Sequence, residues 1–199
     1  MARFNNLEDI ARTAWNLLYR ATVERNNAFR TPIFTTSRAG MPNARTLVLR
    51  EVNVQERQLL FYTDYRSPKV QELQASPNVC LVFWSSNRNV QIRAYGRTTI
   101  EYQNDVAKAY WEKIAPKNRR DYSTLISPST SISAEEAYLP NFWQQQDITT
   151  QQTDYAFRHF ALLSVLVEEL DILHLHRAGH QRAKLYWKNE QWQKTWLVP

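Results

Sequence analysis

The chain has 199 residues, a formal net charge of +6 and only three glycines, Gly40, Gly96 and Gly179. A composition of 43% apolar residues is globular, and no apolar run approaches the roughly 18 residues of a membrane-spanning helix. Three such widely spaced glycines cannot supply a G-x-G-x-x-G turn or a Walker phosphate loop. A single cysteine, Cys80, excludes an internal disulfide and any multi-cysteine metal site.

The positive charge is not distributed as in a nucleic-acid-binding protein. Residues 101–155 carry five basic and eight acidic side chains, whereas residues 31–50 hold three arginines (Arg38, Arg45, Arg50) and no acid. Such a local excess favours a small anion over a polymer backbone. The N-terminal residues contain no apolar signal segment. We therefore expect a cytoplasmic protein that binds neither nucleic acid nor membrane.

The first half of the chain is predicted to form one helix, several short strands and a second helix. Leu7 to about Glu24 has apolar residues at helical spacing. Ser67 and Pro68 open a helix to about Ala75, because serine is a favoured N-cap and proline fits the first helical position. With a turn at Ala39–Asn43, the predicted strands are Ile33–Ser37, Ala44–Glu51, Leu59–Thr63, Val79–Trp84 and Val90–Ile100. In the last of these, Val90, Ile92 and Ala94 face one side, and Gln91, Arg93 and Tyr95 the other.

The second half is predicted to contain an insertion followed by two strands. Asn104–Ile114 has helical spacing, and Ser133-Ala-Glu-Glu136 is a capping box that starts another helix, which Pro140 ends or kinks. The glutamine-rich stretch Gln144–Gln152 is predicted to be a loop. The final strands are Ala161–Glu169 and about Lys184–Trp187.

Many short strands with few helices predict an antiparallel barrel with flanking helices. We expect a single domain over residues 1–199. It would comprise an N-terminal helix (1–26), central strands (31–100), a helical and loop insertion (101–155) and C-terminal strands (156–199).

Basic and hydroxyl side chains gather at the start of the helix that Ser67 opens. The free N–H groups and the dipole of a helix start favour an anion, and Lys69 in the first turn adds a formal charge. Tyr62 and Thr63 end the preceding strand, so Thr63 offers a hydroxyl beside the same place. An ordinary capped surface helix, with packing roles for Tyr62 and Thr63, is the alternative at this point.

Three further polar residues are candidates for ligand contacts. Arg45 and Arg50 bracket the segment ARTLVLR and would point to opposite faces of a regular strand, since they are five residues apart. Gln91 lies between apolar neighbours, and its amide can both donate to and accept from a polar ring edge. Solvated arginines and a satisfied glutamine are the alternatives. Cys80, inside VCLVFW, is expected to be a buried and inert thiol.

The order R-T-L-V-L-R, F-Y-T-D-Y-x-S-x-K and Q-I-R-x-x-G resembles the pyridoxamine 5'-phosphate oxidase family, clearly over about residues 31–100. The resemblance implies a split β-barrel of the antiparallel Greek-key type, FMN as the cofactor, and a homodimer whose cofactor sites lie at the subunit interface. The residues that it implies in FMN binding are Arg45, Thr46, Leu47, Val48, Arg50, Tyr62, Thr63, Ser67, Lys69, Gln91, Ser129, Thr130 and Arg182.

Within that set, the resemblance implies separate roles. Ser67 and Lys69 would hold the phosphate, and Gln91 would face the isoalloxazine ring. Ser129 and Thr130 would reach in from the other subunit. Arg50 and Tyr110 are implied to contact the substrate.

The chain departs from the family pattern at three places. Pro68 stands where the family has an arginine beside the phosphate lysine, and Arg50 stands where a lysine is usual. The C-terminal Arg-x-His-x-Arg run is Arg182-Ala-Lys184, without the histidine that handles the substrate. The sequence therefore predicts an FMN-dependent oxidoreductase of unassigned substrate, and it points to no general acid or base.

Two other classes of function are open from the sequence. One is a non-catalytic protein that carries or senses FMN. The other is a metal site at His174, His176 and His180, because His-x-His on a strand places two imidazoles on one face. Apart from Asp171, no carboxylate or cysteine completes that metal set.

Overall fold

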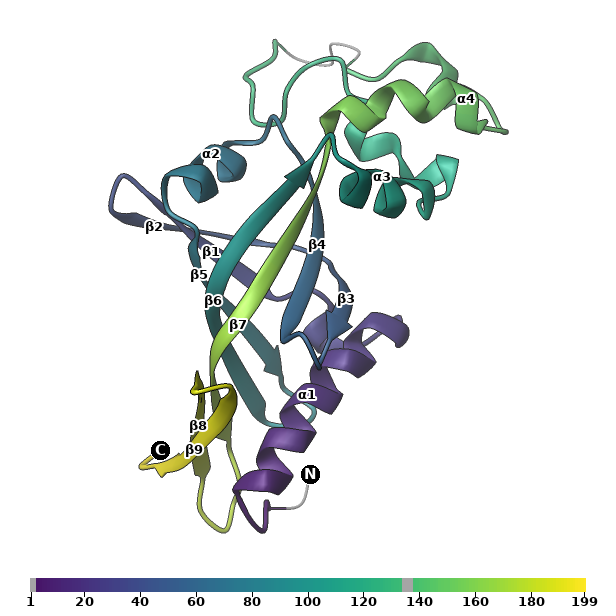
Figure 1. The fold of residues 1–199 in the computed structure, drawn as a ribbon. Coiled ribbons are helices and arrows are strands. Elements are labelled where there is room, and N and C mark those ends of the chain that lie inside the picture. Colours follow the sequence, from purple (N-terminus) through teal and green to yellow (C-terminus); the bar gives the residue numbers. More distant parts are fainter. Residues whose placement is uncertain (1–2, 134–137) are drawn as a thin grey trace. The chain divides into compact units, whose positions relative to one another are not determined.

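The computed structural model describes residues 3–133 and 138–199 (Figure 1). The predicted capping box Ser133-Ala-Glu-Glu136 therefore falls, beyond Ser133, outside the described residues. The chain forms two compact units. The first unit is Met1–Phe61, Ser76–Thr99 and Ser164–Pro199, and the second unit is Tyr62–Ala75 and Ile100–Leu163. The expectation of one domain over residues 1–199 stays a prediction.

The elements are mainly strands, with short helices at several chain reversals. The α-helices are α1 (Leu7–Val23), α2 (Pro68–Ala75), α3 (Asp105–Glu112) and α4 (Thr150–Thr153). The 3-10 helices are η1 (Ala28–Arg30), η2 (Pro116–Asn118), η3 (Arg120–Tyr122), η4 (Asn141–Gln144) and η5 (Asp154–His159). The strands are β1 (Ile33–Arg38), β2 (Met41–Thr46), β3 (Leu49–Asn53), β4 (Gln58–Asp64), β5 (Asn78–Ser85), β6 (Val90–Tyr102), β7 (Phe160–His174), β8 (Gln181–Lys188) and β9 (Gln191–Leu197).

The nine strands form one sheet in the order β2-β1-β5-β6-β7-β4-β3, and β8 adds to β7 and carries β9. Strands β4, β6 and β7 continue along the chain from one unit into the other. In the described parts of the chain, β2 and β3 lie at the two ends of this order, and no pairing joins them. The sheet is therefore not closed, and the predicted antiparallel fold with flanking helices is confirmed.

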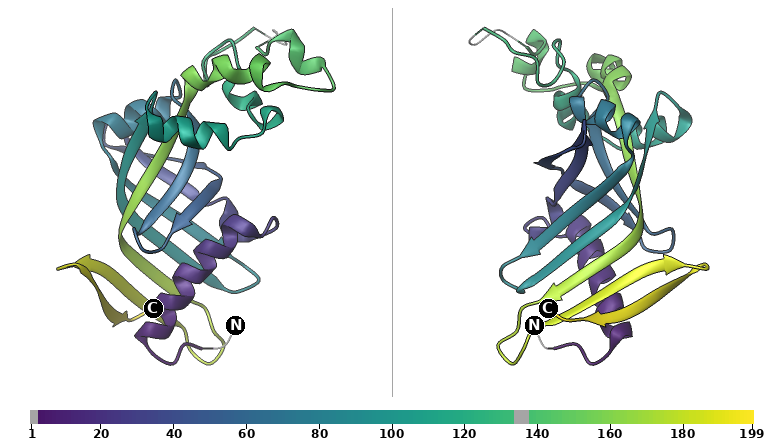
Figure 2. Two further views of the ribbon diagram at one scale, coloured as in Figure 1. Left: turned by 45° about the vertical axis from the view of Figure 1, so that its right-hand side comes forward. Right: turned by 90° about the vertical axis from the view of Figure 1, so that its left-hand side faces the viewer.

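Helix α1 forms where its apolar residues fall on one face. Asn6 caps its start by accepting a hydrogen bond from the backbone N–H of Asp9 (2.8 Å). The buried face packs on β3 and on the β8–β9 hairpin of the same unit, where Trp15 meets Trp192 at a centroid distance of 6.0 Å (Figures 1 and 2). The predicted helix from Leu7 to about Glu24 is confirmed within one residue.

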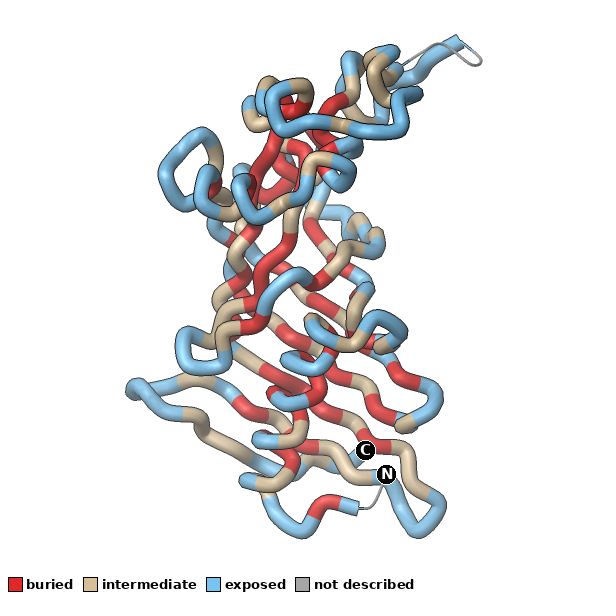
Figure 3. Tube along the Cα trace, turned by 90° about the vertical axis from the view of Figure 1, so that its right-hand side faces the viewer, coloured by how far each residue is buried: buried red, intermediate tan, exposed pale blue. Residues whose placement is uncertain are grey.

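Buried and less buried residues alternate along several strands of the first unit (Figure 3). In β6, Val90, Ile92 and Ala94 are fully buried, and the residues between them are half-buried, so the predicted alternation is confirmed. Gly96 marks a close approach of two strands, because a Cβ built on it would lie 2.1 Å from the carbonyl oxygen of Leu166 in β7. Only a residue without a side chain fits this place.

Two segments differ from the sequence prediction in the N-terminal half. The predicted strand Ala44–Glu51 is wrong, because β2 ends at Thr46 and β3 begins at Leu49. Leu47 and Val48 lie between these two strands, and the N–H of Leu47 donates to the carbonyl of Pro32 (3.2 Å). The turn between β1 and β2 is also shorter than the predicted Ala39–Asn43, because β2 already begins at Met41.

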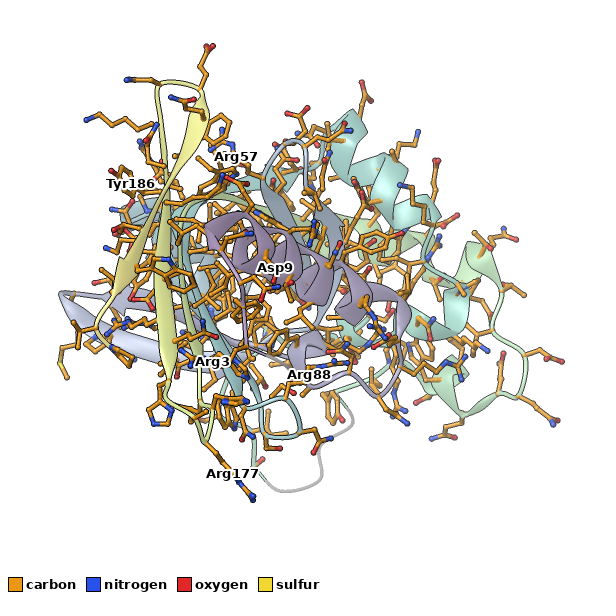
Figure 4. The ribbon with its side chains drawn as sticks, turned by 90° about the horizontal axis from the view of Figure 1, so that it is seen from below. Arg3, Asp9, Arg57, Arg88, Arg177 and Tyr186 are labelled. Atoms are coloured by element: carbon orange, nitrogen blue, oxygen red, sulfur yellow. The ribbon has the colours of Figure 1, made fainter. Side chains whose placement is uncertain are left out.

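The C-terminal half contains more regular structure than predicted. Part of the expected glutamine-rich loop is η4 and α4, and Thr149 and Gln152 form a capping box at the start of α4. Strands β7 and β8 are longer than predicted, and a further strand, β9, pairs with β8 along its whole length. Arg57, labelled in Figure 4, lies over the Trp187 ring of this hairpin at 3.9 Å. The sequence of β9 shows no regular alternation of apolar and polar residues, because Lys194 lies between Trp192 and Trp196 on one face and the other face is mostly polar.

Candidate functional site

Lys69, Thr63 and Ser67 form a hydrogen-bonded cluster in the second unit. Nζ of Lys69 donates to Oγ1 of Thr63 (3.0 Å) and to Oγ of Ser67 (2.9 Å). Both hydroxyl residues are buried, whereas Lys69 is half-buried. These three side chains were selected from the sequence as an anion site, and the structure brings them together at the start of α2.

The predicted helix opened by Ser67 and Pro68 is confirmed, because α2 runs from Pro68 to Ala75 and Ser67 directly precedes it. The Ser67 hydroxyl donates to the carbonyl oxygen of Asp64 (2.6 Å) and accepts from Lys69. Ser67 therefore orients the lysine through its side chain, while its backbone carbonyl accepts from the N–H of Val70 (2.9 Å). The hydroxyl is held by the turn that precedes the helix, which explains why serine follows Asp64 at this spacing.

The electrostatic surroundings of the cluster favour a bound anion. The first turn of α2 contains no acidic residue. Glu72 lies one turn further along α2 and is buried. Asp64, before the helix, accepts hydrogen bonds from Arg66 at both oxygens (3.0 and 2.6 Å), and Arg66 also donates to the carbonyl of Thr124 (3.0 Å). Arg66 thus neutralises Asp64, and Lys69 places a cation at the helix start. The charge of Lys69 and the dipole of α2 both favour an anion at this helix start.

Tyr62 and Tyr110, two aromatic residues predicted for the site, contact each other in the second unit. Tyr62 at the end of β4 packs edge-on against Tyr110 of α3, with centroids 6.2 Å apart, and against Phe160 at 5.2 Å. The ammonium of Lys113 lies 4.1 Å from the Tyr110 ring centroid. Tyr62 was implied for the cofactor and Tyr110 for the substrate, so the structure brings together one residue of each group.

Arg45 and Arg50 lie on different strands. Arg45 of β2 donates to Oγ1 of Thr36 on the neighbouring strand β1 (2.5 Å). Arg50 is exposed on β3, where the pairing with β4 shifts register between Leu49 and Glu51. The expectation of opposite faces from odd spacing in one strand is therefore wrong, because Leu47 and Val48 break the strand between them. Roles for Thr46, Leu47 and Val48 stay predictions.

Gln91 and Arg182 share one face of the first unit. Gln91 pairs with Trp84 across β5 and β6, and Arg93 follows Gln91 on the same face. Arg93 contacts Asp171 on β7, which in turn binds Arg182 on β8. We call this face, with Trp84, Gln91, Arg93, Asp171 and Arg182, the outer face.

Cys80 and Tyr95 pair across the same two strands. Cys80 is half-buried, and burial raises the pKa of its thiol; burial also raises the pKa of Tyr95. A thiol with a raised pKa carries little thiolate at neutral pH. Because Cys80 is only half-buried, the expectation of a buried thiol is wrong, and its inertness stays a prediction that the raised pKa supports.

Asp171 and Arg93 were not among the sequence-predicted site residues. Asp171 of β7 is 2% exposed, which is unusual for a carboxylate. It lies two residues beyond the predicted strand Ala161–Glu169, so the sequence carried no signal that it is buried in a sheet. Its partners on β6 and β8 follow only from the strand order.

Ser129 and Thr130 lie in an exposed loop of the second unit. Ser129 has a positive φ of 67°, and the N–H of Thr130 donates to the carbonyl of Ser127 (3.3 Å). Thr130 also lines a cavity of about 370 Å³. That these residues reach a second subunit stays a prediction.

The histidine segment does not assemble into a metal-ligand set in the structure. Within residues 3–133 and 138–199, no group of three His, Cys, Asp or Glu side chains is placed to hold a metal ion. His174 is buried at the end of β7, with its ring edge-on to Phe4, and Nδ1 of His180 accepts from the N–H of His176 (3.1 Å). The rings of His174 and His176 also lie near each other, with centroids 5.5 Å apart.

A larger cavity, of about 510 Å³, lies beside α3 in the second unit. Its floor is Trp111 and the buried Arg119, whose guanidinium lies 4.4 Å from the indole ring. Arg119 donates to the carbonyls of Ile114 (3.0 Å) and Trp111 (3.2 Å) and pairs with Asp154 (2.8 Å). Arg119 thus satisfies the carbonyl end of α3.

No helix of the described residues is long and apolar enough to cross a membrane.

Comparison with known proteins gives a family for the strands that carry these residues. Residues 12–101 match the family model described as pyridoxamine 5'-phosphate oxidase, FMN-binding domain. A pyridoxine/pyridoxamine 5'-phosphate oxidase of Trichormus variabilis is 33% identical over 139 residues, which are 70% of this chain and 63% of that protein. One of Leptospira interrogans is 32% identical over 111 residues, 56% of this chain and 50% of that protein. The chain thus spans between half and two thirds of these relatives.

Solved structures share the fold. A pyridoxamine 5'-phosphate oxidase-related, FMN-binding protein of Nostoc punctiforme has a TM-score of 0.72 at 22% identity, over 94% of this chain and 96% of that one. PhzG of Burkholderia lata, solved with tetrahydrophenazine-1-carboxylic acid, has a TM-score of 0.74 at 15% identity, over 100% and 98%. The family resemblance and the cofactor expected from the sequence are confirmed. Over residues 12–101, the chain carries the FMN-binding domain of the pyridoxamine 5'-phosphate oxidase family.

Proposed function

We propose that this chain is an FMN-dependent oxidoreductase whose phosphate site is the Lys69, Thr63 and Ser67 cluster. The observation that carries the proposal is the pair of hydrogen bonds from Nζ of Lys69 to the two hydroxyls (3.0 and 2.9 Å) at the start of α2. A cation held beside hydroxyl groups and a helix N-terminus suits a terminal phosphate. The absence of a glycine turn in the sequence favours FMN over a dinucleotide, whose pyrophosphate needs a close backbone approach.

The remaining flavin contacts belong to the same proposal. They are Arg45, Thr46, Leu47, Val48, Arg50, Tyr62, Gln91, Ser129, Thr130 and Arg182, with Arg50 and Tyr110 reaching the substrate. When bound, FMN supplies hydride chemistry, and the protein contributes binding, orientation and electrostatics. The half-buried positions of Gln91 and Arg45 support this, because such side chains can reach a ligand from a fixed backbone.

The proposed assembly is a cytoplasmic homodimer with its cofactor sites at the subunit interface. Large apolar side chains stand exposed on neighbouring strands of the first unit: Ile33 (45%), Met41 (72%) and Trp84 (44%). Exposed apolar groups of this size, on adjoining strands, favour burial against another surface. A molar mass by light scattering that equals one chain, with FMN bound, would refute the dimer.

A non-catalytic FMN carrier or sensor is the second candidate. It is favoured by the sequence Arg182-Ala-Lys184, which lacks the substrate histidine of the family run. Reduction of the bound flavin by NADH or NADPH under anaerobic conditions, followed by reoxidation with a screened acceptor, separates the two. A flavin that stays oxidised with every donor supports the carrier or sensor.

The first expected result is that the purified protein is yellow and releases FMN, without FAD, on denaturation. One cluster of cation and hydroxyls accommodates one terminal phosphate. The measurement is an absorbance spectrum of the protein, followed by chromatography of the released flavin. A colourless protein that does not bind added FMN would refute the proposed function.

A second expected result concerns pyridoxamine 5'-phosphate, which we expect to be a poor substrate. The histidine missing from Arg182-Ala-Lys184 removes a contact, and the family's next substrate arginine has no assigned counterpart among residues 117–120. Each lost charge-assisted contact costs about 1.5–3 kcal/mol, so two such losses lower kcat/KM by orders of magnitude. Oxygen consumption with this substrate, beside a family oxidase as reference, tests the expectation. Turnover equal to the reference would contradict it.

A further inference from the structure

Asp171 is a buried carboxylate that two arginines from neighbouring strands share. Its side chain on β7 is 3% exposed. Arg182 of β8 donates from Nε to Oδ1 (3.1 Å) and from Nη2 to Oδ2 (2.8 Å). Arg93 of β6 donates from Nη2 to Oδ2 (2.5 Å). All three side chains lie on the outer face, within the first unit.

This cluster carries one more positive than negative charge. The neighbouring pair, Glu169 and Lys184 (2.9 Å), is balanced, so the excess stays with Arg93 and Arg182, whose side chains are 32% and 30% exposed. Burial alone would raise the pKa of Asp171, but the hydrogen bonds from Arg182 and Arg93 outweigh it and lower this pKa below its usual range. Asp171 is therefore ionised, and the outer face presents a net positive charge beside Gln91.

The carboxylate fixes the orientation of both guanidinium groups. Two oxygens of Asp171 hold one edge of the Arg182 guanidinium, so the opposite edge points away from Asp171. A long arginine side chain otherwise keeps rotamer freedom, which a ligand would have to overcome. In the described part of the chain, Nε of Arg93 is buried without an acceptor, so the bond to Asp171 is what orients Arg93.

We propose that Asp171 is a positioning residue for the flavin site. It holds the guanidinium of Arg182 in a fixed orientation, and Arg93 binds the same carboxylate. The outward edge of Arg182 then meets the electron-rich pyrimidine edge of the isoalloxazine. The inference rests on the proposed function, in which Arg182 contacts the flavin. It adds a residue that touches no flavin atom and acts through the arginine.

The test combines Asp171→Asn with Arg182→Ala. Asparagine keeps the volume but loses the charge that pairs both arginines. We expect Asp171→Asn to weaken FMN binding about tenfold, a coupling of the usual size for a shared charge network. In the Arg182→Ala background, the same change should have little further effect. Flavin fluorescence titrations of the four proteins give this cycle directly.

The spectrum of the bound flavin separates positioning from a purely structural role. At saturating FMN, we expect the visible absorption bands of Asp171→Asn to match those of Arg182→Ala and to differ from the wild type. A change that only lowers the melting temperature would leave the bound-flavin spectrum unaltered. Glu169→Gln is the matched control, because it breaks a neighbouring ion pair on the same strand and should change neither FMN affinity nor spectrum.

The outcomes distinguish this inference from the proposed function. A wild-type protein that binds no FMN refutes both. A wild-type protein that binds FMN, together with an Asp171→Asn variant of unchanged affinity and spectrum, overturns the positioning role alone, as does full additivity with Arg182→Ala. If Asp171→Asn does not fold, Asp171→Glu takes its place. The longer glutamate displaces the bidentate pair, so the same shifts are expected, and their absence overturns the inference.

Discussion

Lys69→Ala is expected to weaken FMN binding by about 1.5–3 kcal/mol, the range for hydrogen bonds to charged groups. This corresponds to roughly a 10- to 150-fold higher Kd. The reason is that Lys69 is the cation of the cluster at the start of α2, and Pro68 occupies the place of the family's second phosphate cation. Titration of the wild-type and variant apo-proteins with FMN, followed by flavin fluorescence, measures the change.

Riboflavin sharpens this experiment because it lacks the phosphate. If Lys69 holds the phosphate, Lys69→Ala and the wild type should bind riboflavin equally well. The apo-protein should melt at nearly the same temperature or slightly higher, since the change removes a cation from the positive end of a helix. Lys108→Ala, an exposed lysine of α3, removes the same charge elsewhere and should leave the FMN affinity unchanged. Equal losses for riboflavin and FMN would place the phosphate away from α2.

Gly96→Ala is expected to lower the free energy of unfolding by about 3 kcal/mol, at the upper end of what overpacking costs. An added Cβ would lie 2.1 Å from the carbonyl oxygen of Leu166 and 2.9 Å from its carbonyl carbon, and neither backbone atom can move without separating β6 from β7. Because Gln91 and Arg93 lie on β6 and Asp171 on β7, the same shift should also weaken FMN binding.

Chemical denaturation of the apo-protein measures this loss of stability. Gly40→Ala is the control, since its Cβ would meet no atom within 4 Å and only the positive φ of 83° opposes the change. That strain costs about 1–2 kcal/mol. A Gly96→Ala variant as stable as Gly40→Ala would mean that the two strands can separate at little cost.

The local chemistry of the candidate site could be predicted from the sequence. The helix-start signal at Ser67 and Pro68, with Lys69 in the first turn, is a short-range pattern, and the structure places Thr63, Ser67 and Lys69 within hydrogen-bonding distance. The alternation along Val90–Tyr95 also predicted which side of β6 faces the core. Both features depend on residues within a few positions of one another, where backbone geometry alone fixes the spacing.

The contacts between distant strands could not be predicted in this way. The stretch Ala44–Glu51 has the composition of one strand, but pairing of β2 with β1 and of β3 with β4 divides it at Leu47 and Val48. Helix α4 forms in a glutamine-rich stretch because Thr149 and Gln152 cap it, a weak signal among similar polar residues. Strand β9 exists because β8 offers it an edge. For the strands, a pairing partner outweighs local propensity.

The sequence by itself thus determined the helical and strand character of α1 and β6, the grouping of Lys69 with hydroxyl side chains at the start of α2 and the family of residues 12–101. The tertiary structure alone decided that Arg45 contacts Thr36, and that Asp171 joins Arg93 to Arg182. Arg93 and Arg182 are 89 residues apart in the chain. They meet at one carboxylate because β6, β7 and β8 are neighbours in the sheet, and strand order and register are properties of the whole fold.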